Sequence, residues 1–216
     1  MTSKSKQTKK TPISIYFSKD QIPKEYKKNL FDEYPTFSIY KSNDRVCVDL
    51  SKIENLNNLQ RNYTLLLIGQ SIKNSHSSGH FFVDYFGCKK TDIKNFFLGW
   101  SLANYSFEKF KSKKKKRSNS KIFHNFEKEV ETISKSYFYV RDLINTPANF
   151  LGPNEILQSA KGFLKNFTFV GSVSGKKLEK NFPLIAAVGQ GADKGKQPIF
   201  GEFRFRKKNS KKKVFL

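Results

Sequence analysis

The stretch that most constrains this chain covers residues 141–155. A proline disfavours the α conformation in the residue before it, so Pro147 predicts that a helix ends near Asn145 and Thr146. Pro153 suits the first position of a second helix, because its fixed φ fits the turn and its missing N–H would have no partner there. The sequence therefore predicts two helices joined by a connector of defined geometry.

Apolar residues recur every three or four positions on both sides of this connector, which predicts helices. One helix is expected over residues 122–144 and another after Pro153. Short β-branched and aromatic runs then alternate with helical segments, as is typical of an α/β unit. The other elements expected in this half are strands at 168–170, 184–188 and 199–206, a strand beginning at 213, and a brief helix at 176–180.

The first half of the chain has the same mixed pattern. The continuous apolar run at 63–69 ends in Gly and predicts a strand buried on both faces. Residues 36–40 and 45–50 flank a polar turn and predict a hairpin. A helix capped by Thr91 is expected over 92–110, and its broad aromatic stripe predicts core packing rather than an open platform for stacking bases. The remaining expectations are a disordered basic arm at 1–11, strands at 13–17 and 81–86, a helix at 51–60, and a polar loop at 70–80.

The formal net charge of +23 allows two interpretations. A basic surface attracts phosphate groups, so the chain could be a module that binds nucleic acid or another polyanion with salt-dependent affinity. Alternatively the excess of Lys is compositional, because Lys is spread along the chain and Arg, the preferred reader of base edges, is scarce. The compositional interpretation is favoured. The one block of charge, residues 111–117, is interpreted as a solvated loop or a weak polyanion contact.

Composition also excludes several classes of protein. The 22 Phe residues argue against general disorder. No apolar run reaches the roughly 18 residues that a membrane span needs, and no apolar core follows the basic N-terminus, as a secretory signal would require. Cys47 and Cys88 are too few for a disulfide framework, which favours a reducing, cytoplasmic compartment.

Three segments resemble the leucyl (cytosol) aminopeptidases, a family of hexameric two-metal exopeptidases. Residues 141–155 resemble the family's R-D-L-x-N-x-P-x-N-x-x-T-P segment. Residues 187–192, followed by 197–200, look like its A-V-G-x-G-(S/A)…P-x-(L/I) segment. Residues 99–111 are similar to its G-x-x-L-x-x-Y-x-F-x-x-Y-K stretch. The order and approximate spacing of these segments agree with the family.

The resemblance implies an α/β fold with an N-terminal macro-like α/β domain at 12–118, a linking helix at 119–146 and the first, incomplete α/β unit of the catalytic domain at 147–216. It implies removal of N-terminal residues from peptides by a homo-hexamer that holds two divalent metal ions, manganese or zinc. The chain departs from the family pattern at Ala148, where a second Pro is usual, and at Gly152, where Thr would cap the next helix.

No catalytic, metal-binding or substrate-binding residue is assigned in this chain. The family's metal ligands and catalytic residues belong to downstream motifs, the first of the form V-G-K-G-(V/L)-x-F-D-(T/S)-G-G, and residues 213–216 are expected to be the strand that leads into it. The resemblance thus implies a fragment or truncated product that binds no metal and is catalytically silent. Uncovered strands at 184–188, 199–206 and 213–216 would make it poorly soluble. Capping or surface roles are expected for the acidic residues Asp142, Glu155, Asp193 and Glu202.

Three other sequence patterns do not predict a catalytic or binding site. His76 and His80 have a spacing that can chelate zinc on a helix, but their segment is a poor helix former, so they are interpreted as solvated loop residues. A Cys88–His80 pair lacks a third residue to orient it. The Gly189-Gln190-Gly191 segment lacks the further residues of a phosphate-binding loop and is interpreted as a tight turn.

Overall fold

The computed structural model describes residues 10–16, 21–53, 56–76, 78–85, 89–113 and 119–205. The chain divides into two compact units, Met1–Val140 and Arg141–Leu216, called unit 1 and unit 2 below. Within the described ranges, none of the helices combines the length and apolarity that a membrane-spanning segment requires.

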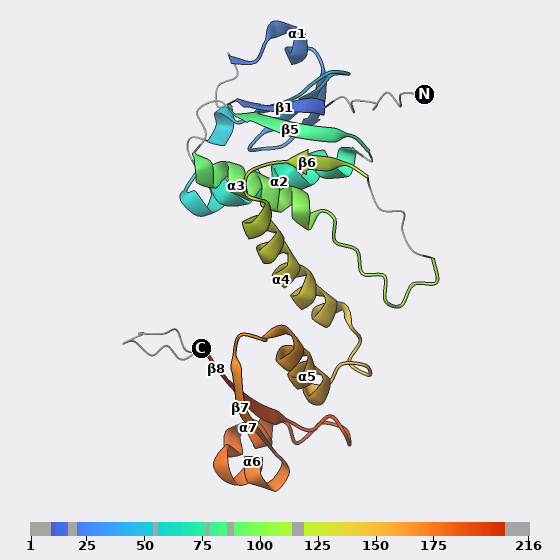
Figure 1. Ribbon diagram of the computed structural model, residues 1–216, viewed down its shortest axis with the longest axis vertical. Coiled ribbons are helices and arrows are strands. Elements are labelled where there is room, and N and C mark those ends of the chain that lie inside the picture. The colour runs from blue at the N-terminus through green and yellow to red at the C-terminus, as the bar shows by residue number, and fades with distance from the viewer. Residues whose placement is uncertain are drawn as a thin grey trace, which may run out of the picture. The chain divides into compact units, whose positions relative to one another are not determined.

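Unit 1 is built on a six-stranded sheet with strand order β2-β3-β4-β1-β5-β6 (Figure 1). The central strand β1 pairs in parallel with β4 on one side and β5 on the other, and β5 pairs in parallel with β6. β2, β3 and β4 are antiparallel. The mixed, mostly parallel sheet confirms the predicted α/β class. The strands are β1 (Lys10–Tyr16), β2 (Leu30–Glu33), β3 (Ser38–Lys41), β4 (Val46–Asp49), β5 (His80–Tyr85) and β6 (Lys121–Phe123).

Several predicted strands of unit 1 are confirmed, with small shifts at their ends. The hairpin at 36–40 and 45–50 corresponds to β3 and β4, and the strand at 81–86 corresponds to β5. The predicted disordered arm is wrong at Lys10 and Thr11, because they belong to β1 and pair with β5. Residues 1–9 lie outside the described residues.

Both faces of this sheet carry buried side chains. Ile13 and Ile15 of β1 and Val46 and Val48 of β4 belong to the larger core cluster. The alternate residue Cys47 belongs to a smaller cluster that also includes Tyr16, Ile22 and Tyr40. This alternation follows from the two-residue period of a strand. The larger cluster is covered by α2 (Asn58–Ser75) and α3 (Lys90–Leu102), and α1 (Lys24–Lys27) lies on the other side of the sheet (Figure 1).

The predicted buried strand at 63–69 is wrong, because these residues lie inside α2. Two hydrogen bonds begin that helix: the Asn57 side chain accepts from the Gln60 N–H at 2.9 Å, and the Gln60 side chain accepts from the Asn57 N–H at 3.2 Å. The helix predicted at 51–60 is wrong as one continuous helix, because Ser51–Ile53 forms a 3₁₀ turn and α2 begins at Asn58. The loop predicted at 70–80 is wrong over residues 70–75, which belong to α2.

The helix predicted at 92–110 is shorter than expected. It begins at Lys90, and the Asp92 carboxylate rather than Thr91 accepts the free N–H of Lys89, at 3.2 Å. It ends at Leu102, where the Asn104 side chain donates to the carbonyls of Trp100 and Ser101. The predicted stripe is buried where the helix exists, at Ile93, Phe96, Phe97 and Trp100.

The helix predicted at 122–144, within the linking helix expected at 119–146, also begins later than expected. α4 spans Glu127–Asn145, because Lys121–Phe123 pairs with β5 as β6. His124 then turns the chain by accepting the Phe126 N–H at Nδ1, 3.0 Å away. The C-terminal end of α4 at Asn145, before Pro147, is as predicted.

The described part of unit 2 contains a two-stranded antiparallel sheet and short helices. The predicted start of a helix at Pro153 is confirmed. The strand predicted at 184–188 is wrong: Pro183 occupies the first position of a short helix, with Leu184 83% and Val188 90% exposed. The strand predicted from 213 lies outside the described residues. The elements are α5 (Pro153–Phe163), β7 (Thr168–Ser174), α6 (Gly175–Asn181), α7 (Pro183–Val188) and β8 (Ile199–Arg204).

Candidate functional site

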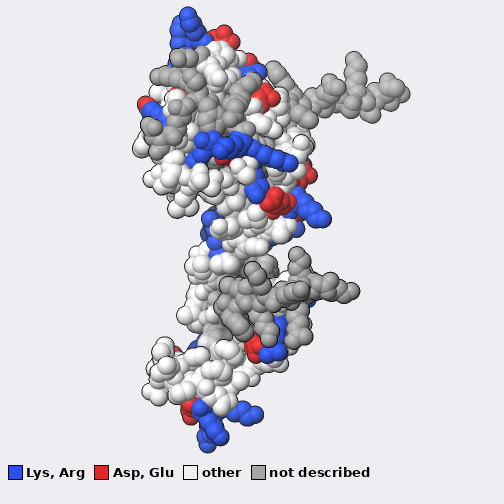
Figure 2. Space-filling model, turned by 90° about the vertical axis from the view of Figure 1, so that its left-hand side faces the viewer, with Lys and Arg blue, Asp and Glu red and all other residues white. Residues whose placement is uncertain are grey.

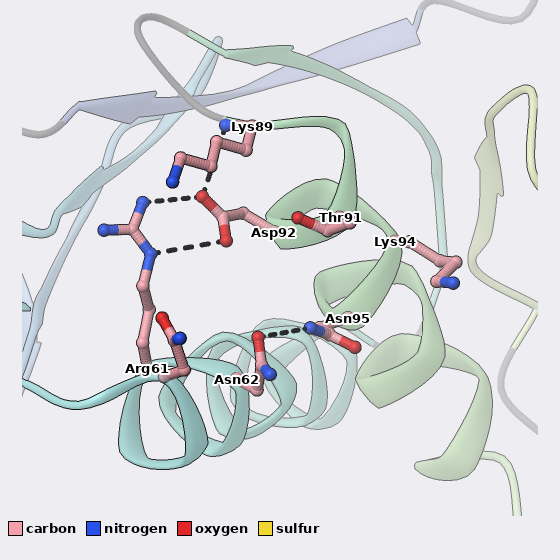
Figure 3. Close-up of a pocket in the computed structure, with 8 residues that line it drawn as sticks. Arg61, Asn62, Lys89, Thr91, Asp92, Lys94 and Asn95 are labelled. Atoms are coloured by element: carbon pink, nitrogen blue, oxygen red, sulfur yellow. Dashed lines mark hydrogen bonds and ion pairs between the residues drawn. The ribbon is translucent and has the colours of Figure 1, made fainter.

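A polar cavity of about 450 Å³ lies between the first turns of α2 and α3 in unit 1 (Figure 3). We call it the α2–α3 cavity. α2 follows β4 and α3 follows β5 through short connections, so the cavity lies at the carboxyl ends of these parallel strands. Ligands of open α/β sheets usually bind at that edge. The lining residues are Asn58, Arg61, Asn62, Lys89, Thr91, Asp92, Lys94 and Asn95.

A nearly buried ion pair forms one wall of the cavity. Arg61 of α2 donates to both carboxylate oxygens of Asp92 on α3, at 2.6 Å and 3.3 Å (Figure 3). The Asp92 side chain is 4% exposed and that of Arg61 is 23% exposed. Asp92 also accepts the N–H of Lys89, so its negative charge is satisfied within the fold. A carboxylate held in this way is a structural anchor and is poorly placed to act as a general base.

Close packing of the two helices fixes the other wall. Asn95 donates to the Asn62 side chain at 2.8 Å (Figure 3). One turn further along both helices, the Gly99 Cα approaches the backbone of Leu66, and Gly69 approaches the backbone of Phe96 in the same way. Because neither glycine has a Cβ, the helices can approach this closely. Their first turns are therefore held side by side around the cavity.

Two lysines complete the lining. The Lys94 ammonium pairs with Glu129 of α4 at 2.8 Å, and both side chains are substantially exposed. Lys89 lies at the start of α3 beside the Arg61–Asp92 pair (Figure 3). The lining thus carries three cationic side chains and one carboxylate, with amide and hydroxyl groups between them. Such a set can bind an anion by charge and hydrogen bonds, but it offers no nucleophile with an adjacent base.

A second polar pair lies deeper in unit 1. Lys73 near the end of α2 is 3% exposed, and its ammonium donates to the Ser120 hydroxyl at 2.7 Å. Burial lowers the pKa of Lys73. The same ammonium lies 5.8 Å from the centre of the Trp100 ring. These contacts tie the segment before β6 to α2.

His76 and His80 are half-buried and packed against aromatic rings, so their interpretation as solvated loop residues is wrong. His76 follows the last turn of α2, lies 2.8 Å through Nδ1 from the Ile72 carbonyl and packs edge-on against Phe81. His80 is the first residue of β5 and contacts Phe123 edge-on. Burial lowers the pKa of His76.

The four acidic residues that were expected to have capping or surface roles lie apart from one another in unit 2. Glu155 accepts the Gly152 N–H at 2.7 Å, and Glu202 pairs with Arg204 at 2.6 Å. Asp142 and Asp193 use their backbone carbonyls in local turns. Among the residues that the structure describes, no three His, Cys, Asp or Glu side chains form a group that could hold a metal ion.

The two cysteines and the Gly189–Gly191 turn were the remaining residues considered as possible functional sites. Cys47 is a fully buried free thiol, and burial raises its pKa to about 11, so it is not a reactive nucleophile. Cys88 lies outside the described residues. Gly189–Gly191 forms a turn after α7, as predicted.

The α2–α3 cavity was not predicted from the sequence. Because residues 63–69 were expected to form a strand, the start of α2 was not predicted. The Asn57-x-x-Gln60 spacing before that run is a capping pattern that indicates where the helix begins. The partnership of Arg61 with Asp92 joins residues 31 positions apart, and nothing local in the sequence indicates it.

Comparisons with known proteins find similarity to aminopeptidases in sequence and in fold. The chain is 31% identical over 140 residues to a probable cytosol aminopeptidase of Phytoplasma mali (strain AT), a match that covers 57% of this chain and 28% of that protein. No profile of a known protein family matches the chain.

Solved structures of similar fold extend the match to nearly the whole chain. The cytosol aminopeptidase of Coxiella burnetii has a TM-score of 0.67 at 21% identity and covers 94% of this chain and 45% of that one. The bottromycin maturation enzyme BotP in complex with Mn gives 0.64 at 13% identity, covering 90% and 45%. A mutant of tomato leucine aminopeptidase gives 0.63 at 11% identity, covering 96% and 50%.

The fold is therefore that of an α/β protein and is similar to solved structures of cytosol and leucine aminopeptidases. In sequence, the chain is similar to a probable cytosol aminopeptidase. It spans less than a third of its curated relative and about half of the solved structures that it matches.

Proposed function

We propose that this chain supplies the N-terminal portion of a leucyl aminopeptidase-like metallo-exopeptidase, whose reaction is the removal of N-terminal residues from peptides. The observation that carries the proposal is the match to a probable cytosol aminopeptidase at 31% identity. The extension of the fold match across both units, at 94% of the chain, supports it. We place the protein in the cytoplasm and assign it a homo-hexameric assembly on the same family grounds.

We further propose that these 216 residues do not hydrolyse peptides alone. Two-metal hydrolysis requires several side chains that converge on ions about 3.5–4 Å apart. The described residues provide no such donor set, and the family's first ligand motif does not occur in the sequence. The residues present therefore do not fit the two manganese or zinc ions of the family, and no metal-dependent step is assigned to them.

An assay on leucine p-nitroanilide with added manganese tests this proposal. We expect no release of p-nitroaniline above the rate without protein. Turnover that rises with protein concentration and disappears with a chelator would contradict it, because it would require a complete metal site. Co-expression with a polypeptide that carries the family's ligand motifs is the positive arm, and activity there would support the assignment to the N-terminal portion.

A second candidate function is a basic module that binds nucleic acid or another polyanion. The observation in its favour is the formal net charge of +23, together with a band of Lys and Arg side chains across unit 1 in Figure 2. Filter binding of a labelled duplex at two salt concentrations separates the two candidates. A steep fall in affinity with salt favours this module, because each phosphate contact releases counterions.

A further inference from the structure

We infer that the α2–α3 cavity binds a phosphate-bearing small molecule. This inference concerns a ligand of unit 1 and does not depend on peptide hydrolysis. It rests on the chemistry of the lining, on the place of the cavity in the fold and on the rigidity of its walls.

The lining selects the charge of the ligand. Every lining residue has a polar or charged side chain, so the cavity favours a ligand that carries charge or hydrogen-bonding groups. A cation is disfavoured because three lining residues are cationic and the one carboxylate, Asp92, already accepts from Arg61 and from the Lys89 N–H. An anion is favoured by the positive charges of Arg61, Lys89 and Lys94 and can accept from the amide groups of Asn58 and Asn62. Ammonium groups bind phosphate oxygens through short, charge-assisted hydrogen bonds.

The position and size of the cavity select the kind of anion. It opens at the carboxyl ends of β4 and β5, the edge where open parallel sheets bind phosphorylated ligands. Its volume of about 450 Å³ falls within the range of small-molecule sites, about 300–1,000 Å³. This volume leaves room for an organic group beside a phosphate.

The walls are preorganised, and one rim cation can change partner. The Arg61–Asp92 and Asn62–Asn95 contacts hold the helices, so binding requires no rearrangement of the backbone. Lys94 pairs with Glu129 across a solvent-exposed gap, with side chains 30% and 54% exposed. Exposed ion pairs contribute little free energy, so this lysine can exchange its carboxylate partner for a phosphate.

Isothermal titration of the full chain with ADP, pyrophosphate and adenosine, at physiological ionic strength, tests the inference. The test variant is Lys89→Ala/Lys94→Ala, which removes the two lysines of the cavity. The matched control is Lys28→Ala/Lys135→Ala, which removes the same charge from residues outside the lining. Thermal melting of both variants verifies that each is folded.

We expect one site per chain for ADP or pyrophosphate and none for adenosine. The cavity variant should weaken binding about tenfold or more, since hydrogen bonds to charged groups are each worth about 1.5–3 kcal/mol, whereas the control should change it less than about twofold. Tighter binding of ADP than of pyrophosphate would identify a nucleotide, and the reverse a free polyphosphate. An equal loss of affinity in both variants would show that only the overall charge matters and would overturn the inference. Binding of adenosine, or no binding of either phosphate compound, would also overturn it.

Discussion

At the scale of single residues, Asp92 shows how a charged group is kept inside unit 1. Its carboxylate is almost completely buried and would be costly to desolvate alone. Two hydrogen bonds from Arg61 and one from the Lys89 backbone balance that cost. The same three contacts form the wall of the α2–α3 cavity, so stability and the candidate site depend on one carboxylate.

Replacement of Arg61 by Leu should therefore destabilise unit 1 by about 3–5 kcal/mol, because it leaves the buried carboxylate without its charged partner. Trp100 is the only tryptophan of the chain and is buried in unit 1, so its fluorescence during urea unfolding reports on that unit. Lys135→Ala, which breaks the exposed pair with Glu131, is the control and should cost less than about 1 kcal/mol. Equal effects of the two substitutions would contradict the structural role of Arg61.

The surroundings of His124 indicate how the stability of unit 1 depends on pH. Its ring stacks on Phe97, with ring centres 4.0 Å apart, and Nδ1 accepts the Phe126 N–H. Burial lowers the pKa of His124 below its usual 6.5, against a smaller raising effect of Glu127. The unfolded chain therefore binds the proton first, and stability is lost as pH falls through 6.5 toward the lowered pKa.

The substitution His124→Asn keeps an acceptor for the Phe126 N–H and removes the titration. We expect the urea midpoint of the variant to fall less steeply than that of the unsubstituted chain between neutral pH and about pH 5. Part of the slope should remain, because burial also lowers the pKa of His76. Identical slopes would show that the His124 ring does not resist protonation in the fold.

At the scale of elements, the contact between α2 and α3 organises unit 1. Gly69 and Gly99 let the helix backbones approach, and the aligned first turns then enclose the cavity. A Cβ on Gly99 would collide with the Leu66 carbonyl, and backbone cannot move aside as a side chain can. The spacing of the helices is therefore set by the absence of two side chains.

The substitution Gly99→Ala should destabilise the protein by about 1–3 kcal/mol, as overpacking of a close contact does. The same change at Gly162 of α5, where an added Cβ meets open space, should be neutral or stabilise by up to about 1 kcal/mol. Thermal unfolding followed by far-ultraviolet circular dichroism compares the two variants. A Gly99 variant as stable as the Gly162 variant would mean that the helices are not in close contact.

The elements also show what the sequence could predict. The hairpin of β3 and β4 is predictable because two short runs of strand-forming residues flank a polar turn. The apolar run at 63–69 has the pattern of a buried strand but belongs to α2, where Leu65 and Ile68 lie in the core and Tyr63 is 60% exposed. Residues 184–188 were also predicted to form a buried strand. They instead form a largely exposed short helix that begins at a proline. The cavity depends on a contact between distant residues that no local pattern carries.

At the scale of the whole molecule, unit 2 presents much apolar surface. Leu184 and Val188 of α7 are among its most exposed apolar residues, and Phe150 and Phe205 are 56% and 59% exposed. Exposed apolar surface promotes association in water. Poor solubility stays a prediction, and the exposed apolar residues include those of a helix where the sequence predicted a strand.

The double substitution Leu184→Lys/Val188→Lys should raise the monomer fraction of the full chain in sedimentation velocity, because it removes exposed apolar surface. A control with equal added charge, Asn181→Lys/Gln190→Lys, changes two polar residues that flank the same helix and should leave association nearly unchanged. If the monomer fraction rises equally in both variants, the added charge and not the loss of apolar surface causes the rise, which would contradict the prediction.

The central proposal is that these residues supply the N-terminal portion of an aminopeptidase-like protein and hold none of its metal ions. Equilibrium dialysis of the purified chain against manganese, followed by elemental analysis, tests it most directly. We predict no retained manganese after a brief wash in metal-free buffer. Two manganese ions retained per chain and released by a chelator would contradict the claim.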